Sequence, residues 1–196
     1  MIPDAIQKLA DALAELPGIG PRQALRIAFR LASNGKRALE QLMTAGANMR
    51  ALTLCTQCFL PHDSGDDLCR ICNDKSRSAD LVAIIEKETD LIALEASKQF
   101  RGRYLVLGPL KRDGALTTDH RTRLTALKNQ FKSAPATEII IALSPTTYGD
   151  VNSASISAEL KGVAKKITRL GRGLPSGGEV EFADEETLGG ALTNRN

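Results

Sequence analysis

The chain has 196 residues, which suits one or two domains, and 42% of them are hydrophobic, enough for a packed core. With no Trp, two Tyr and five Phe, it is poorly equipped for a nucleic-acid surface made mainly of base-stacking aromatic residues. The formal net charge is +3, and residues 1–54 alone hold seven Lys or Arg against four Asp or Glu, a balance of +3. A surface that binds nucleic acid is therefore expected first in this N-terminal part.

Nothing in the sequence has the pattern of a targeting or membrane segment. Asp4 and Asp11 interrupt the start of the chain, where a signal peptide would carry a basic cap and an unbroken apolar run. The longest apolar runs, such as residues 139–143, are far too short to cross a bilayer. We therefore expect a cytoplasmic protein without a membrane partner, in which thiols stay reduced and available to metal.

Three helices are predicted in the first part of the chain. Apolar residues recur at helical spacing over 3–16, and a second such pattern begins after Pro21 and ends at Asn34-Gly35. A third runs from about residue 36 to residue 54. Four apolar residues of this third helix are expected to face inward: Leu39, Leu42, Met43 and Leu52.

A Pro-Gly-Ile-Gly-Pro turn at residues 17–21 separates the first two helices. Its glycines would let the backbone pass close to another chain and turn N–H groups outward, next to the positive end of the following helix. Arginines then follow at four-residue intervals, so they share one side of that helix. An ordinary packing corner with a solvated basic face would give a similar pattern, but the flanking prolines and the arginine row favour a helix-hairpin-helix that binds DNA phosphates. The predicted DNA-binding residues are Gly18, Gly20, Arg22, Arg26 and Arg30.

The chain's only cysteines come next, in the spacing C-x2-C-x10-C-x2-C. They are Cys55, Cys58, Cys69 and Cys72. Two such knuckles joined by a short loop can bring four thiolates to the corners of one tetrahedron, the geometry of a structural zinc site. Two disulfides or a redox pair are alternatives, but the expected reducing compartment and the tandem arrangement favour one Zn²⁺ per chain. Four protein ligands leave no open position, so this metal should stabilise structure and not catalyse.

After the cysteines the pattern changes to apolar strands alternating with amphipathic helices. Strands are predicted at 81–86, 104–107, 138–143 and 167–170, and helices at 90–98, 118–131 and 151–161. This alternation predicts an α/β fold with a mostly parallel sheet covered by helices on both faces. The end of the chain is glycine-rich and then acidic, which we interpret as a short strand and a terminal helix. The predicted parts are 1–54 (DNA binding), 55–78 (zinc module), 79–172 (α/β domain) and 173–196 (C-terminal extension).

Two acids of the α/β part are candidates for chemistry, whereas the two histidines of the chain are not. Glu86 ends the first strand, and Asp150 is the acid that follows the third. Ligands of open α/β sheets bind beyond the carboxyl ends of the strands, so these acids could hold Mg²⁺. Two carboxylates make a poor metal site, however, and a strand cap or a partner contact is the favoured interpretation. His62 and His120 stand alone in the sequence and are expected to face solvent.

In this order the helix-hairpin-helix, the four-cysteine module and the α/β part resemble the RecR family of bacterial recombination mediators. The motifs that carry the resemblance lie at residues 16–21, 55–72, 102–108 and 172–178. The resemblance implies a Toprim-type α/β domain, zinc at the four cysteines, and DNA contact by Arg22 and Arg26. It also implies docking of RecO and RecF on the Toprim domain, and a clamp-like homo-oligomer, a dimer or tetramer, that encircles DNA. The extension at 173–196 is a candidate oligomer contact, and the family's role is to help load recombinase onto gapped single-stranded DNA.

Two segments depart from the family's pattern. Tyr148 stands where the family usually has an acid, and residues 109–113 form a more basic loop than is usual. The favoured function is a non-enzymatic DNA-repair protein in which Glu86 and Asp150 contact partners. The first alternative is a Mg²⁺-dependent Toprim nuclease or primase-like enzyme, but such enzymes add an Asp-x-Asp pair, which Ser144 and Thr146 do not provide. The second alternative is a zinc-stabilised adaptor that binds only protein.

Overall fold

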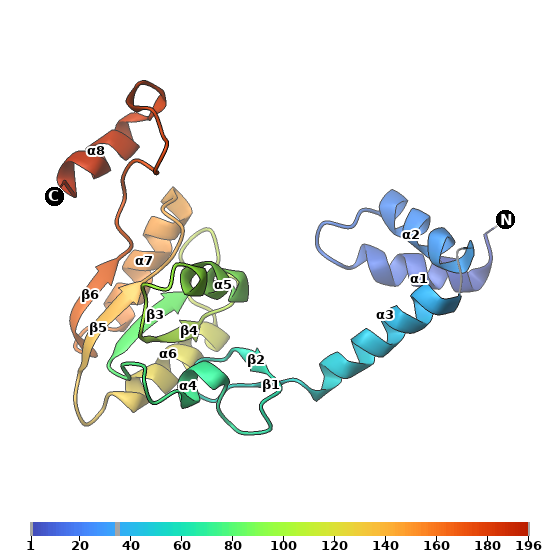
Figure 1. The fold of residues 1–196 in the computed structure, drawn as a ribbon, viewed down its shortest axis with the longest axis horizontal. Coiled ribbons are helices and arrows are strands. Elements are labelled where there is room, and N and C mark those ends of the chain that lie inside the picture. Colours follow the sequence, from blue (N-terminus) through green and yellow to red (C-terminus); the bar gives the residue numbers. More distant parts are fainter. Residues whose placement is uncertain (1, 34–35, 196) are drawn as a thin grey trace. The chain divides into compact units, whose positions relative to one another are not determined.

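The computed structural model describes residues 2–33 and 36–195, and the chain divides into two compact units, Met1–Leu52 and Thr53–Asn196 (Figure 1). The first unit holds the N-terminal helices, and the second holds the cysteine module, the α/β part and the C-terminal extension. The cysteine module therefore shares a unit with the sheet. The finer division into four parts stays a prediction. Within the described ranges, no helix is long and apolar enough to cross a membrane.

The first unit is built on a helical hairpin. α1 (Asp4–Ala14) and α2 (Pro21–Ser33) pack against each other, and their shared core consists of Ala10, Ala24 and Ala28. Because these three side chains are small, the two helix backbones can approach closely. This packing fixes the turn between the two helices, on which the predicted DNA-binding glycines lie.

The third helix departs from the sequence-based expectation. α3 (Lys36–Asn48) gives way to a short 3-10 turn, η1 (Met49–Ala51), and does not continue to residue 54. The prediction that four of its apolar residues face inward is wrong within this unit: Leu39 is half-buried, and Leu42 is 51%, Met43 66% and Leu52 40% exposed. The buried cluster of the unit lies between α1 and α2, so it offers these side chains no core to join.

The second unit is centred on a four-stranded sheet with the strand order β4-β3-β5-β6, in which every pair is parallel. The strands are β3 (Leu81–Ile85), β4 (Arg103–Val106), β5 (Ala136–Ile141) and β6 (Ala164–Arg169). The helices α5 (Glu88–Ala96), α6 (Thr118–Gln130) and α7 (Thr147–Glu159) follow the first three strands in turn. Parallel neighbours need such crossover connections. The predicted α/β class is confirmed.

Different elements cover the two faces of the sheet (Figure 1). On one face, α6, α7 and the C-cap residue of α7 contribute four fully buried residues: Leu124, Leu127, Ile156 and Leu160. On the other face, Leu91 of α5 packs together with Leu60 and Ile71 of the cysteine module. The sheet thus has helices on both faces, as expected, but the cysteine module takes a share of the second.

α7 begins four residues earlier than the apolar pattern predicts, at Thr147. The side chain of Thr146 caps it by accepting a hydrogen bond from the backbone N–H of Gly149 at 3.1 Å. Asp150 therefore lies in the first turn of a helix and not in a loop beyond the strand.

Gly149→Ala should destabilise the second unit by on the order of 1–3 kcal/mol. A Cβ at this position would lie 1.9 Å from the carbonyl oxygen of Ser144, so the backbone between β5 and α7 would have to move. Gly46→Ala is the matched control, because a Cβ there meets nothing within 4 Å and Ala is the better helix former. Denaturant unfolding of both variants gives the two free energies. An equal effect of the two substitutions would contradict the steric explanation.

Within residues 173–195, the regular elements of the C-terminal extension are helical. It contains a 3-10 turn, η2 (Val180–Phe182), and α8 (Glu185–Thr193), whose N-terminus is capped by the side chain of Asp184. The short strand predicted here is wrong for this described range. Residues 171–178 contain four glycines and one proline, and such residues favour turns over strand pairing.

Candidate metal centre and nucleic-acid interface

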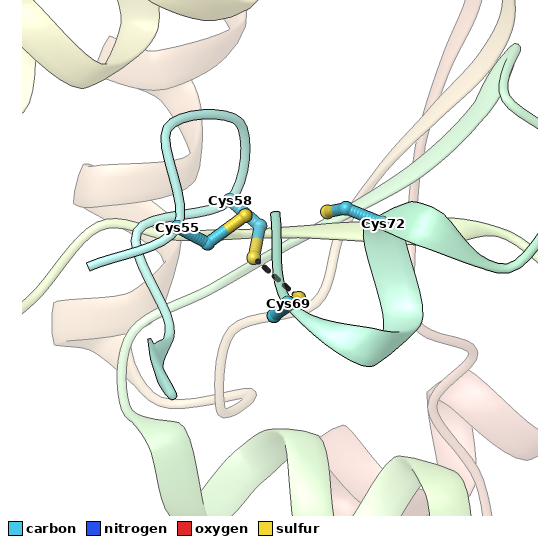
Figure 2. A group of neighbouring side chains, drawn as sticks. All are labelled: Cys55, Cys58, Cys69 and Cys72. Atoms are coloured by element: carbon cyan, nitrogen blue, oxygen red, sulfur yellow. Dashed lines mark hydrogen bonds between the residues drawn. The ribbon is translucent and has the colours of Figure 1, made fainter. Parts of the chain in front are cut away.

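The four cysteines come from two short segments that fold next to each other (Figure 2). The first pair lies on the turn between β1 (Thr53–Leu54) and β2 (Pro61–His62), which form a small antiparallel ladder. The second pair belongs to the first turn of α4 (Arg70–Asn73), one at its N-cap and one inside it. The first pair is Cys55 and Cys58, and the second is Cys69 and Cys72.

The geometry of the cluster fits one tetrahedral metal ion. The four sulfur atoms lie within 4.8 Å of one another, and all four side chains are buried. Thiolates that bind zinc at about 2.3 Å would lie about 3.8 Å apart, and the sulfurs of Cys58 and Cys69 are 3.5 Å apart. All four cysteines are free, which argues against the two-disulfide alternative. Four such ligands would leave the ion no open position for a substrate.

Thiols packed this closely cannot all ionise without a cation. Hydrogen bonding with Cys58 lowers the pKa of the Cys69 thiol. Contacts with Cys69 and Cys72, together with burial, raise the pKa of the Cys58 thiol. A divalent ion at the centre would replace these hydrogen bonds and let all four thiols deprotonate. The donor set therefore suits a metal ion better than a set of free thiols.

The cysteine module also pairs with the edge of the sheet. The backbone N–H of Val106 in the edge strand β4 donates to the carbonyl oxygen of Cys58 at 2.9 Å. The next residue, Phe59, has a φ of 61°, and the Arg123 guanidinium lies 5.1 Å from its ring centre. Arg123 of α6 also donates to the carbonyl oxygen of Val106 at 2.9 Å. These contacts join the cysteine turn, β4 and α6, so the metal centre and the sheet edge are physically linked.

The turn between α1 and α2 is tight and open to the outside. Gly18 has a φ of 82°, a conformation that favours glycine. The N–H of Ile19 donates to the carbonyl oxygen of Leu16 at 3.1 Å. The N–H of Ala24 donates to Gly20 at 2.9 Å. A Cβ on Gly20 would meet no atom within 4 Å, so packing inside the chain does not require a glycine there. The surface of the turn is free to accept an external group.

The three predicted arginines are exposed on α2 but do not form one straight row. Arg26 and Arg30 line a groove of about 530 Å³ together with Phe29. Arg22 lines a second hollow of about 240 Å³ against α1, beside Asp11. The cause is helical geometry, because a step of four residues turns through about 400° and so drifts by about 40°. The basic surface therefore wraps partly around the helix.

Beyond the end of β3, Glu86 accepts hydrogen bonds from its own chain. The Tyr148 hydroxyl donates to Oε1 of Glu86 at 2.7 Å and lies 2.9 Å from the carbonyl oxygen of Leu110. The N–H of Leu110 also donates to the same carboxylate oxygen at 3.2 Å. Burial, and after it the contact with Glu86, raises the pKa of Tyr148 to about 12, so the phenol stays a donor at neutral pH. These two hydrogen bonds thus occupy one of the two oxygens that Glu86 could offer to a metal ion.

Asp150 does not join Glu86. Its carboxylate pairs with Arg169 at the end of β6 and with Arg172, which also pairs with Glu186 of α8. Arg169, and after it Arg172, holds the pKa of Asp150 below its usual value. The sequence analysis missed both arginines. The available signal was their position at the end of the strand that neighbours β5 and just after it, because adjacent parallel strands have their carboxyl ends on the same side of the sheet. The partner-binding roles predicted for Glu86 and Asp150 stay predictions.

Both histidines are buried, so the expectation that they face solvent is wrong. His120 is 3% exposed, its Nδ1 accepts from the N–H of Thr117, and its Nε2 lies 3.1 Å from the carbonyl oxygen of Pro109. The contact with Thr117 is half of a capping box at the start of α6, and the contact with Pro109 ties the ring to the preceding loop. His62 is 8% exposed, and its Nδ1 contacts the Ser64 hydroxyl at 2.6 Å. Both side chains therefore hold local structure.

Three family models match consecutive parts of the chain. The model described as RecR, helix-hairpin-helix, matches residues 6–47, and the Toprim domain model matches residues 80–171. The model described as RecR, C-terminal, matches residues 173–196. The cysteine module lies between the first two matches, in the order that the sequence motifs predict.

Curated relatives match along almost their whole length. The chain is 39% identical over 201 residues to "Recombination protein RecR" of Mycobacterium leprae (strain TN), covering 100% of this chain and 98% of that protein. It is 35% identical over 196 residues to the protein of the same name from Paenarthrobacter aurescens (strain TC1), covering 100% of this chain and 98% of that protein. It is 37% identical over 192 residues to the protein of that name from Frankia casuarinae, covering 97% of this chain and 95% of that protein. With these relatives and the three matching models, the chain belongs to the RecR family, and its α/β part is a Toprim domain.

Proposed function

We propose that this protein is a non-enzymatic recombination mediator in DNA repair that binds DNA without sequence preference. The observation that carries the proposal is the exposed turn before α2 with its arginines, within the part that matches the RecR helix-hairpin-helix model. The name that these relatives share, "Recombination protein RecR", supports the same process. The family resemblance adds the finer role, in which RecO and RecF act with this protein to load recombinase onto gapped single-stranded DNA.

The DNA contact in this proposal is made to phosphates and not to bases. Gly18 and Gly20 would bring backbone N–H groups close to the DNA backbone, and the open space at both glycines supports this role. Arg22, Arg26 and Arg30 would add charge on the adjoining helix, where all three side chains are exposed. Contacts of this kind fix orientation and carry no sequence information.

The metal in this proposal is one structural Zn²⁺ per chain, held by the four cysteines. Sulfur ligands, burial and near-tetrahedral spacing are the features that suit zinc. The ion would fix the turn that follows β1 and the start of α4, and would take no part in chemistry.

The proposed assembly is a clamp-like homo-oligomer, a dimer or tetramer, around DNA. Large apolar side chains that their own unit leaves exposed support this proposal, since such surfaces are usually covered by a partner. They are Leu42 and Met43 in α3, and Val180 (63% exposed), Phe182 (78%) and Leu192 (65%) in the C-terminal extension. The Toprim rim with Glu86 and Asp150 is the proposed docking surface for RecO and RecF.

Purified protein with Mg²⁺ or Mn²⁺ should not cleave, nick or prime DNA. Phosphodiester chemistry by Toprim enzymes needs clustered carboxylates, but Glu86 is hydrogen-bonded to Tyr148, and Asp150 is paired with two arginines. The assay uses labelled single-stranded and nicked duplex DNA over hours of incubation. A Glu86→Ala protein purified in parallel controls for contaminating nucleases. If activity is seen in the wild type and is lost in Glu86→Ala while DNA binding is kept, the enzyme alternative holds.

A further inference from the structure

A pocket of about 600 Å³ lies beyond the carboxyl ends of the Toprim strands, where the superfamily's metal chemistry would be sought. Its lining has a different chemical character from a metal site. Besides Glu86 and some apolar atoms, it consists of cations and hydroxyls: Lys87, Arg112, Ser144, Thr146 and Thr147, together with Tyr148, whose hydroxyl already donates to Glu86. Such a set offers hydrogen-bond donors and positive charge, which suit an anion.

The one carboxylate in the lining is engaged by its own chain through one of its two oxygens, Oε1. Glu86 accepts from the Tyr148 hydroxyl at 2.7 Å and from the N–H of Leu110 at 3.2 Å. The second acid near the carboxyl ends of the strands, Asp150, pairs with Arg169 and Arg172 and is absent from the lining. The two cations, Lys87 and Arg112, are exposed and belong to none of the ion pairs found in residues 2–33 and 36–195.

The loop that carries Arg112 is held in place by buried contacts. Asn152 is fully buried, and its Nδ2 donates to the carbonyl oxygens of Lys111 at 2.8 Å and Tyr148 at 3.0 Å. On the other side of Arg112, the N–H of Gly114 donates to Lys111 at 3.2 Å. The backbone on both sides of the cation is thus fixed, so little backbone ordering is required when an anion binds.

We propose that this pocket binds a backbone phosphate of single-stranded DNA, as a second contact besides the helix-hairpin-helix. Phosphate oxygens accept several hydrogen bonds at once, which matches the cations and hydroxyls of the lining. The surrounding charge favours a long polyanion over a short acidic peptide, because residues 55–172 hold 18 Lys or Arg against 14 Asp or Glu, a balance of +4. This inference rests on the proposed DNA-binding function and places part of it in the Toprim domain.

The test compares two double variants that lose the same charge. Lys87→Gln with Arg112→Gln removes the pocket cations. Lys132→Gln with Lys161→Gln removes exposed cations at the other ends of the strands. Lys132 lies between α6 and the start of β5, and Lys161 lies between α7 and the start of β6. Binding of a labelled oligothymidine is measured against salt concentration, in the wild-type background and with Arg22→Ala and Arg26→Ala. The pocket pair should lower the salt slope by about 0.7 units, because one neutralised phosphate of a single strand contributes about that much, and the control pair should not.

Each outcome decides the matter. Equal slopes for the pocket and control variants overturn the inference; if the hairpin arginines then still reduce binding, the proposed function stands without it. Failure of the wild-type protein to bind DNA would contradict the proposed function itself. As a second readout, bound oligothymidine should slow acetylation of Lys87, followed by mass spectrometry, and leave Lys132 unchanged. Protection of Lys87 by a poly-glutamate peptide but not by oligothymidine would overturn the inference in favour of an acidic protein partner.

Discussion

Removing the metal from the four-cysteine cluster should unfold the edge strand β4 of the Toprim sheet, while the α1–α2 hairpin stays folded. Metal binding in small modules contributes on the order of 10 kcal/mol to folding, which is comparable to the whole stability of a domain. Without the ion, the turn whose Cys58 carbonyl accepts from Val106 loses its constraint. Leu60 and Ile71 would then leave the second face of the sheet. Cys58→Ser should act in the same direction, because it removes one of four ligands.

Hydrogen exchange with mass spectrometry, with and without a chelator, locates the damage. We expect faster exchange in residues 53–73 and in β4, and unchanged exchange in α1 and α2. Asp66→Ala, an exposed change in the same loop, should keep one zinc per chain in a metal assay. Unchanged exchange in β4 after complete metal removal would show that the ion does not support the sheet. Two disulfides found by thiol titration of fresh protein would rule out the metal site.

Arg22→Ala and Arg26→Ala should each weaken DNA binding about tenfold, and the double variant about a hundredfold. Charge-assisted hydrogen bonds of this kind are worth on the order of 1.5 kcal/mol, and each lost phosphate contact should lower the salt slope by about one unit. Lys8→Ala is the matched control, because Lys8 is exposed in the same unit but pairs with Asp4 at 2.8 Å. It should change binding little.

Fluorescence anisotropy on two unrelated DNA sequences, over about 50 to 200 mM salt, measures these effects. Circular dichroism confirms that each variant is folded. The losses should be the same on both sequences, because phosphate contacts do not read bases. A strong preference for one sequence, or an affinity that does not depend on salt, would contradict the mechanism. Binding unchanged in the double variant would favour an adaptor that binds only protein.

The type and order of the secondary-structure elements could be predicted from the sequence because they depend on local patterns. Apolar runs bounded by turn residues gave all four strands of the sheet to within a few residues, and helical periodicity gave α1 and α6. The cysteine spacing predicted the cluster because short loops leave the four thiols few other arrangements. The start of α7 was missed because it depends on a cap by Thr146 and not on apolar residues.

What could not be predicted depends on contacts between distant residues. Tyr148 and Glu86 are 62 positions apart, and their hydrogen bond changes the character of the strand-end pocket. Asp150 finds Arg169 and Arg172 only because β5 and β6 are neighbours in the sheet. His120 carries no sequence signal for burial, because its partner is the carbonyl of a loop that precedes the helix. In each case tertiary structure decides the role of a side chain.

The hydrogen bond between Val106 and Cys58 also bears on the order in which the protein can fold during synthesis. The cysteine segments leave the ribosome before any strand of the large sheet, and domains tend to fold from the N-terminal side as they emerge. Ten residues separate the two knuckles, so closing this loop costs little entropy. A metal ion bound at this stage would hold the Cys58 carbonyl ready before β4 exists. Zinc supply at the moment of translation would then determine whether the edge of the nascent sheet is covered at once or left open to pairing with other chains.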